Sequence, residues 1–178
     1  MSNIDTVTRG PYARLLGDAY TRLDPIVRRA HEAPLAAHGL VDVTHGSRWW
    51  TPVLIAGMRL PAVGPAQRVS LVVSADGASL RWMRRIGSSP LHTVQAAIDG
   101  RLVERSGIGS VSFDLTVDGG ALLYRQHAMH VAGVRLPGFA SPRVEASVSP
   151  SGNGWRVSVD VTWRGHLVCR YAGIITPV

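Results

Sequence analysis

The sequence contains no lysine and only one cysteine. All 19 basic residues are arginine, and with 12 acidic residues the formal net charge is +7. Nucleic-acid-binding proteins usually cluster their basic residues, whereas these arginines are spread along the chain, so we expect no nucleic-acid partner. The positive field still favours anionic ligands. The lone Cys169 excludes an internal disulfide and favours a reducing cytoplasm.

Long apolar runs are also missing. No stretch approaches the roughly 18 residues of a membrane-spanning helix, so we predict no membrane span. Residues 1–5 lack the basic start and apolar core of a signal peptide, which again favours a cytoplasmic location. Hydrophobic residues nevertheless make up 46% of the 178 residues and charged residues only 17%, which excludes a disordered chain. We therefore expect one folded domain, residues 1–178.

Helix signals are confined to the N-terminal part of the chain. Apolar residues at helical spacing predict a helix over 11–23. Asp24-Pro25 supplies an N-cap and a first-turn proline for a second short helix reaching about His31. We assign residues 11–40 to this helical segment. Trp49 and Trp50 precede another short apolar helix, which we interpret as a lid packed on the sheet, with a membrane-surface segment as the alternative.

Alternation of apolar and polar residues dominates from Arg68 onward. The clearest run covers residues 155–163, where every second residue is Trp or Val. This period of two indicates antiparallel strands with one buried face. Turn signals such as Asp76-Gly77 and Asp118-Gly119-Gly120 separate about nine or ten such strands. We predict a mainly β fold: an antiparallel meander curled into a barrel or half-barrel, with the N-terminal helices over one mouth.

Two matched segments suggest that the barrel has two similar halves. Ala-Gly-x-Arg-Leu-Pro occurs at 56–61 and again at 132–137. A second pair, Gly-Arg-Leu-Val-Glu-Arg at 100–105 and Gly-His-Leu-Val-Cys-Arg at 165–170, follows in the same order. The period is far longer than that of solenoid repeats. We therefore expect a first β half over 41–110 and a second over 111–178.

The usual signatures of catalysis and cofactor binding are absent. The sequence has no phosphate-binding loop, no GxGxxG motif and no GxSxG motif. Paired-cysteine zinc sites are excluded by the single cysteine. His127 and His130 would lie on opposite faces of a strand and could share a metal ion only at a bulge. We expect neither a cofactor nor a metal.

Polar residues within otherwise apolar strands are the candidate site. Candidate catalytic residues are Glu104, Tyr124 and His130, and candidate ligand-binding residues are Trp82, Arg84 and Leu122. In this hypothesis Arg84 pairs with Glu104 or with a ligand oxygen, and Tyr124 or His130 donates a hydrogen bond to a ligand carbonyl. Trp82 and Leu122 form the apolar wall. The alternative is that strand alternation turns these polar groups outward into water.

Several motifs resemble a known bacterial family. They are Trp82-Met83-Arg84-Arg85, the 100–107 segment Gly-Arg-Leu-Val-Glu-Arg-Ser-Gly, Pro142-Arg143-Val144-Glu145-Ala146 and the closing 165–173 segment. Together they resemble domain of unknown function 4166, whose members occur alone or behind an NAD(P)-binding, saccharopine-dehydrogenase-like or short-chain-reductase-like domain. The resemblance implies binding of the apolar or lipid-like substrate of an oxidoreductase, and a reductase as a partner. The chain departs from the family pattern at 126–130.

Three functions remain open from the sequence. The first is binding of a hydrophobic small molecule, lipid-like or polyketide-like, with a carbonyl or acidic group. The second is a cofactor-free cyclase or isomerase that acts on such a substrate, because orientation alone can supply ~7–11 kcal/mol of a barrier. The third is a non-catalytic interaction module for a separate reductase, with Trp49, Trp50 and exposed arginines as anchors.

Overall fold

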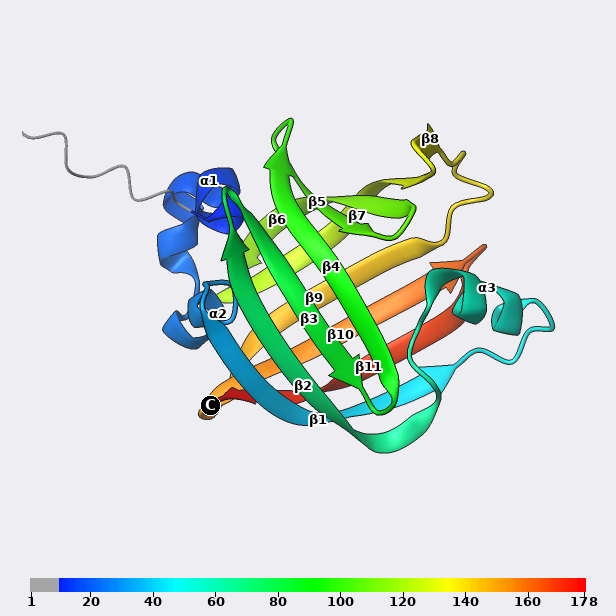
Figure 1. Cartoon of the computed structure of the whole chain (residues 1–178), viewed down its shortest axis with the longest axis horizontal. Helices are drawn as coiled ribbons and strands as arrows, with labels where there is room; N and C mark the ends of the chain where they lie inside the picture. Colours follow the sequence, from blue (N-terminus) through cyan, green and yellow to red (C-terminus); the bar gives the residue numbers. More distant parts are fainter. Residues whose placement is uncertain (1–9) are drawn as a thin grey trace, which may run out of the picture.

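The computed structural model describes residues 10–178 (Figure 1). Residues 1–5, on which the expectation about a signal peptide rests, lie outside the described range. The described part of the chain starts with α1 (Pro11–Leu16), the 3-10 helix η1 (Gly17–Arg22) and α2 (Pro25–Arg29). The helix predicted over 11–23 divides at Gly17, whose φ of 52° leaves the helical region. The side chain of Asp24 accepts a hydrogen bond from the Ile26 backbone N–H at 3.0 Å, which confirms the predicted N-cap.

The strands form one closed antiparallel barrel. They are β1 (Leu35–His45), β2 (Gly64–Asp76), β3 (Ser79–Ile86), β4 (Ser89–Ile98), β5 (Arg101–Ser106), β6 (Gly109–Asp118), β7 (Ala121–Val131), β8 (Val134–Arg135), β9 (Arg143–Ser151), β10 (Gly154–Trp163) and β11 (His166–Pro177). Each strand pairs with the next along the chain, except that β9 returns to β7, and β11 closes the ring on β1. Ten strands close the barrel and β8 is an extra strand beside β7, which confirms the predicted barrel.

The assignment of residues 35–40 to the helical segment is wrong. These residues begin β1, where Leu35 and Ala37 are buried and Ala36 and His38 are exposed. Gly39 lies inside this strand. A Cβ atom there would stand only 2.1 Å from the carbonyl oxygen of Ile174, so only glycine permits this close approach of β1 and β11. The expected boundary between the halves, at 110–111, also falls within a strand, β6.

The two Ala-Gly-x-Arg-Leu-Pro segments differ in local structure. The first ends the helix α3 (Thr51–Met58), and Arg59 after it is left-handed with a φ of 53°. The second forms the tight turn between β7 and β8, where Gly133 has a φ of 80°. Pro61 and Pro137 both lie outside the strands, in the β1–β2 and the β7–β9 connection. The same six-residue pattern therefore adopts two different backbone conformations.

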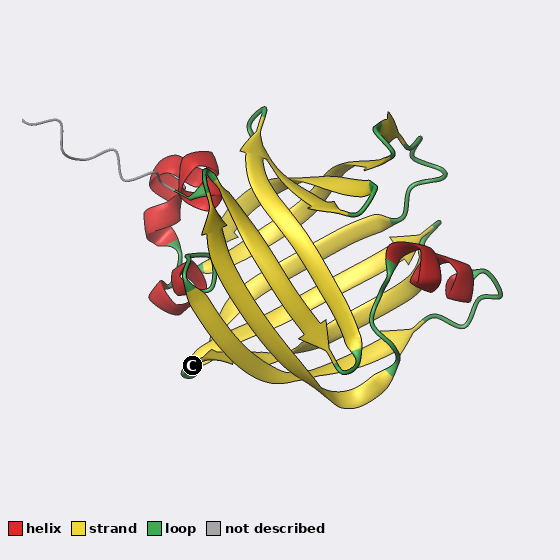
Figure 2. Cartoon of the chain, viewed as in Figure 1, coloured by secondary structure: helices red, strands yellow, loops and turns green. Residues whose placement is uncertain are grey.

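Helices occupy both ends of the barrel (Figure 2). α1, η1 and α2 cover one end, which we call the helical end, and Tyr12, Leu23 and Val27 are buried in the core there. α3 lies at the opposite end together with the β5–β6 turn and β8; we call this the open end (Figure 1). Trp50 packs edge-on against Trp163 at 4.9 Å, as a lid would, whereas Trp49 is 87% exposed. Within residues 10–178, no helix has the length and apolar character needed to cross a membrane.

Candidate ligand-binding cavity

The barrel encloses a cavity of about 580 Å³. Its walls are mostly apolar because strand alternation turns one face of each strand inward. Val41, Val69 and Leu71 line one side, and Val157, Val159 and Val161 of the long alternating run line another. Ala30 and His31, just after α2, border the cavity at the helical end. The cavity reaches the surface at the open end, between the residues that follow α3 and the β5–β6 turn.

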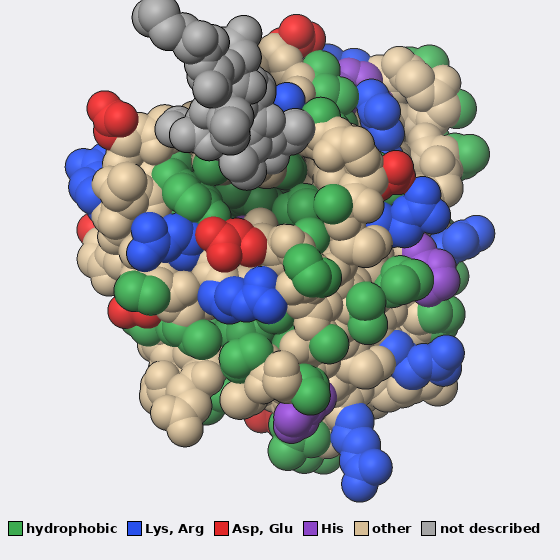
Figure 3. Space-filling view, turned by 60° about the vertical axis from the view of Figure 1, so that its left-hand side comes forward, with side chains coloured by type: hydrophobic (Ala, Val, Ile, Leu, Met, Phe, Trp, Pro, Cys, Tyr) green, Lys and Arg blue, Asp and Glu red, His purple; other side chains and the backbone are tan. Residues whose placement is uncertain are grey.

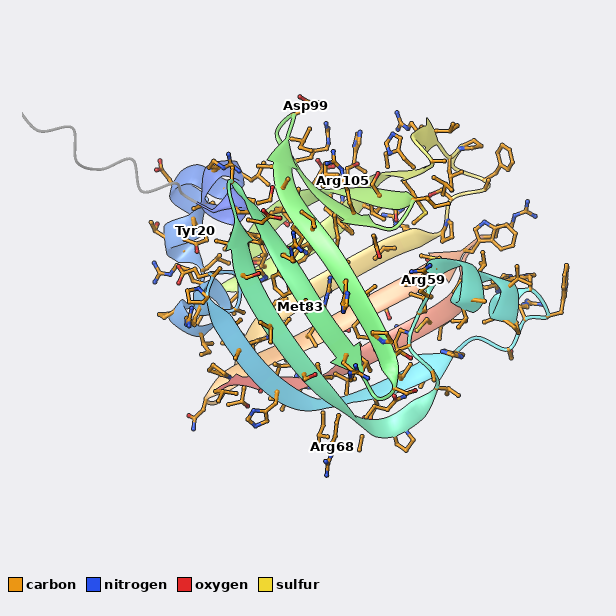
Figure 4. The ribbon with its side chains drawn as sticks, in the orientation of Figure 1. Tyr20, Arg59, Arg68, Met83, Asp99 and Arg105 are labelled. Carbon is orange, nitrogen blue, oxygen red and sulfur yellow. The ribbon has the colours of Figure 1, made fainter. Side chains whose placement is uncertain are left out.

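Five of the six predicted site residues line this cavity. They are Trp82 and Arg84 of β3, Glu104 of β5, and Tyr124 and His130 of β7. The intervening Met83 points away from the barrel interior (Figure 4), as alternation requires. Leu122 is fully buried, but it packs in the core at the helical end and not in the cavity wall.

Arg84 and Glu104 form an ion pair in the cavity wall. Arg84 also donates to the hydroxyl of Thr93 at 2.7 Å. About a fifth of each charged side chain is accessible, and that surface faces the cavity. Burial disfavours the charged form of Glu104, but Arg84 and hydrogen bonds from Thr93 and Gln95 outweigh it, so the pKa of Glu104 is lowered. The pair therefore stays ionised and is electrically neutral as a unit.

Two donors at this pair have no hydrogen-bond partner among residues 10–178. The indole Nε1 of Trp82 and the guanidinium Nε of Arg84 are both buried without a hydrogen bond. The Arg84 guanidinium carbon lies 5.3 Å from the centre of the Trp82 ring, so the two donors belong to one small region. An unsatisfied buried donor costs about 1–3 kcal/mol. Neither nitrogen atom is accessible from the cavity as it stands, so a ligand oxygen could accept from them only after the two side chains shift.

A second polar network closes the cavity at the helical end. The Tyr124 hydroxyl lies 2.6 Å from Nε2 of His31, and Nδ1 of His31 lies 2.7 Å from the Val27 carbonyl oxygen. The carbonyl can only accept, so Nδ1 carries the proton and Nε2 accepts from Tyr124. Tyr12 donates to Gln95 at 2.6 Å and lies 3.2 Å from the Tyr124 hydroxyl. The proton of Tyr124 is thus directed at His31 and not at the cavity.

Burial sets the protonation states of this network. It lowers the pKa of His31 to about 4, against a small opposing effect of the hydrogen bond to Val27. It raises the pKa of Tyr124 well above its ordinary value and the pKa of Tyr171 to about 12. At neutral pH the histidine and the tyrosines are therefore uncharged, and the Arg84–Glu104 pair contributes the charges in this part of the wall.

His130 lies further along β7, apart from this network, and β7 contains a bulge between Tyr124 and His130. The register of β6 and β7 shifts between Ser112 and Phe113, which face Ala128 and Gln126 respectively. One extra residue reverses the alternation beyond it, so Met129 is buried and His130 is only half-buried. His130 borders both the cavity and an outer groove at the open end. Strict alternation along β7 would place Tyr124 and His130 on the same face, and the sequence alone does not show the bulge.

Sequence reasoning missed four residues of the two networks. Leu91, Thr93 and Gln95 occupy every second position of β4, and all three line the cavity. Strand alternation could therefore have indicated that Thr93 and Gln95 face the same side as Leu91. Tyr12 and His31 come from the helical segment, and no spacing rule links them to a strand residue more than 90 positions away. Among residues 10–178, no three His, Cys, Asp or Glu side chains gather in a way that could hold a metal ion.

The fold and the cavity define a small closed antiparallel β-barrel with an apolar interior and a few convergent polar groups, the usual composition of a small-molecule site. The family model described as Domain of unknown function (DUF4166) matches residues 23–174. The chain therefore belongs to this family, as the sequence motifs indicated. No curated protein matches the chain.

Proposed function

We propose that this protein binds a hydrophobic small molecule inside the barrel, with one oxygen atom of the ligand held beside Trp82 and Arg84. The observation that carries the proposal is a cavity of about 580 Å³ with apolar walls and two buried, unpartnered donors. Small-molecule sites commonly measure about 300–1,000 Å³ and combine such walls with a few polar groups. A lipid-like or polyketide-like molecule has this character.

The charge of the wall favours a neutral oxygen over a carboxylate. Glu104 already compensates the charge of Arg84, so an acidic ligand would add an uncompensated charge to a mostly apolar cavity. A carbonyl or hydroxyl oxygen can accept from Trp82 Nε1 or Arg84 Nε without that cost. Of the two ligand groups expected from the sequence, carbonyl and acidic, the carbonyl is therefore the better fit.

A direct binding experiment tests the proposal. Nile red, a neutral apolar dye, serves as the reporter, and hexadecanal, hexadecanol and hexadecanoate compete for it. We expect the aldehyde and the alcohol to displace the dye better than the carboxylate. Trp82→Phe keeps an aromatic ring but removes the N–H, and should weaken aldehyde binding by about tenfold, the low end of the 1–3 kcal/mol range for an unpaired group.

Matched variants decide where the ligand sits. Trp49→Phe makes the same chemical change at an exposed ring outside the cavity and should leave binding unchanged. Val159→Trp fills the cavity and should abolish displaceable dye binding while the far-ultraviolet circular dichroism stays β-like. Full dye and aldehyde binding by folded Val159→Trp protein would refute a ligand inside the barrel.

The presence of Glu104 and Tyr124 in one cavity wall supports a second candidate, a cofactor-free isomerase. In this reaction Glu104 would take a proton from the carbon next to a substrate carbonyl. The Tyr124 hydroxyl would turn from His31 and donate a hydrogen bond to the enolate oxygen. Glu104, whose carboxyl proton exchanges with solvent, would then return a proton to another carbon of a conjugated enolate. Binding remains our first proposal because the lowered pKa of Glu104 makes it a weak base.

Deuterium exchange separates the two candidates. A long-chain enolisable ketone incubated in D₂O gains deuterium next to its carbonyl only if a base removes that proton. An isomerase should accelerate the exchange, and Tyr124→Phe should slow it without loss of Nile red binding. Exchange at the uncatalysed rate with full ligand binding would exclude the isomerase and leave the binding function.

A further inference from the structure

We infer that the open end of the barrel docks on an anionic membrane surface, so that the ligand passes between the bilayer and the cavity. The docking surface consists of α3 with the residues on either side of it, the β5–β6 turn, the segment from β8 to β9, and the β10–β11 turn. The inference of docking depends only on the properties of this surface. The exchange of a ligand rests on the proposed function.

Exposed apolar side chains surround the opening of the cavity. Six large ones come from the α3 region, the β5–β6 turn and the segment from the end of β7 to β9: Trp49, Val53, Ile108, Val131, Val134 and Phe139. Trp49 is 87%, Ile108 74% and Phe139 71% exposed. Exposed apolar side chains are ordinary when they are scattered singly, but a contiguous group of them marks an interaction surface.

Direct contacts join these segments into one continuous surface. The indole N–H of Trp163 in β10 donates to the carbonyl oxygen of Phe139 at 3.1 Å, and the Trp163 ring packs on Trp50 just before α3. On the opposite side, the Ala132 backbone N–H donates to the carbonyl oxygen of Ile108 at 2.8 Å. The apolar residues are therefore held around the opening by the frame of the barrel.

Charge at this end is predominantly positive. Segments 46–63, 86–91, 106–112, 127–143 and 161–168 contain no aspartate or glutamate, and together they hold Arg48, Arg59, Arg135, Arg143 and Arg164. Arg143 is paired with Glu145 of β9. Arg59, at the end of α3, also lines the cavity (Figure 4). Such a surface is complementary to the phosphates of anionic lipids, and tryptophan beside arginine suits the interface between headgroups and acyl chains.

The position of the cavity opening favours a membrane over a protein partner. The apolar residues encircle the route by which a ligand enters, since Met58, Ile108 and Val131 line the cavity and Ile108 and Val131 are also exposed. A protein seated there would block that route. A bilayer supplies both a negatively charged surface and an apolar medium in which a poorly soluble ligand is dissolved. Docking would bring the two apolar compartments together without an intervening layer of water.

Flotation with lipid vesicles tests the inference on the full chain. Vesicles of phosphatidylcholine alone are compared with vesicles in which a third of the lipid is phosphatidylglycerol. We expect binding to the anionic vesicles, weakened by salt. Arg48→Glu with Arg135→Glu should reduce that binding by at least about tenfold, because each basic residue near an anionic surface contributes to attraction. Trp49→Ala with Phe139→Ala should reduce it at any salt concentration.

Variants with the same chemical change on the barrel wall are the controls. Arg68→Glu with Arg156→Glu changes the net charge equally, at exposed residues of β2 and β10. Leu40→Ala with Ile174→Ala removes apolar side chains that are 52% and 41% exposed on the wall. Both control variants should bind vesicles as the original protein does. Equal losses in the wall and open-end variants would overturn the inference.

The remaining outcomes separate this inference from the proposed function. Nile red and aldehyde binding without vesicle binding would overturn the docking surface and leave the ligand-binding cavity intact. Vesicle binding lost in the open-end variants, without any ligand in the cavity, would support docking and refute the exchange role. Binding of the open end to an acidic protein such as a reductase, with no affinity for vesicles, would also overturn the inference.

Discussion

The helical end and the open end of the barrel differ in which polar and apolar groups are buried and which are exposed. At the helical end, hydroxyl, amide and imidazole groups are buried and bonded to one another, as in the contact between Tyr124 and His31. Acidic and basic side chains alternate on its surface (Figure 3), for example in the pair of Arg81 and Asp76 at 2.9 Å. At the open end the apolar side chains are exposed and arginine predominates among the ionised side chains.

This difference indicates that the two ends of the barrel have different roles. The helical end resembles the rest of a folded interior, because its buried polar groups are largely satisfied and its apolar residues are covered. The open end has apolar surface that folding leaves uncovered. Residues at the helical end should therefore govern stability, and residues at the open end should govern what the protein contacts.

The largest effect on stability should come from breaking the buried ion pair. Glu104→Gln leaves the charge of Arg84 without compensation in the cavity wall and should lower the free energy of unfolding by about 3 kcal/mol. Urea denaturation measures this loss. Glu145→Gln, which removes a carboxylate paired with Arg143 at the surface, should cost less than about 1 kcal/mol. Equal costs would show that the cavity pair behaves as a surface pair.

A comparable loss should follow from a cavity created in the core at the helical end. Leu122 is fully buried, and Leu122→Ala should lower the free energy of unfolding by about 3 kcal/mol through lost packing. Ligand affinity per folded molecule should stay the same, because Leu122 does not line the cavity. A loss of Nile red affinity in folded Leu122→Ala protein would place Leu122 in the binding wall after all.

Acidification should weaken the helical end selectively. Because burial lowers the pKa of His31 to about 4, the unfolded chain binds a proton between about pH 6.5 and pH 4 that the folded chain does not. The free energy of unfolding is thus fully retained above pH 6.5 and falls by up to about 3 kcal/mol as the pH drops to about 4.

Variants at two histidines isolate this contribution. His31→Gln should flatten the dependence of the urea midpoint on pH in that range, whereas His38→Gln, at an exposed position of β1, should leave it unchanged. The same slope in His31→Gln protein would assign the acid sensitivity to other groups.

The smallest effect on stability should come from the open end. Ile108→Ser replaces an exposed apolar side chain and should change the free energy of unfolding by less than about 0.5 kcal/mol. Phe139→Ser should behave in the same way. A loss above 2 kcal/mol in thermal or urea unfolding, the size of a core substitution, would show that these residues stabilise the barrel and are not a free contact surface.

Local patterns in the sequence were enough to predict the strands, the turns and the barrel. Alternation placed Trp82 and Arg84 on one face, and the two residues do line one cavity with Glu104. The Asp24 cap was also visible, because capping depends on residues a few positions apart. These features arise from neighbouring residues along the chain, so the sequence alone determined them.

Only the tertiary structure decided the remaining features, because they depend on contacts between distant segments. The bulge in β7 moved His130 to the edge of the cavity, and strand pairing turned residues 35–40 into part of β1. His31 reaches Tyr124 because the N-terminal helices close the barrel, a contact across 93 positions that leaves no local pattern in the sequence. The open end, likewise, becomes one surface of apolar and arginine side chains only when the barrel brings its turns together.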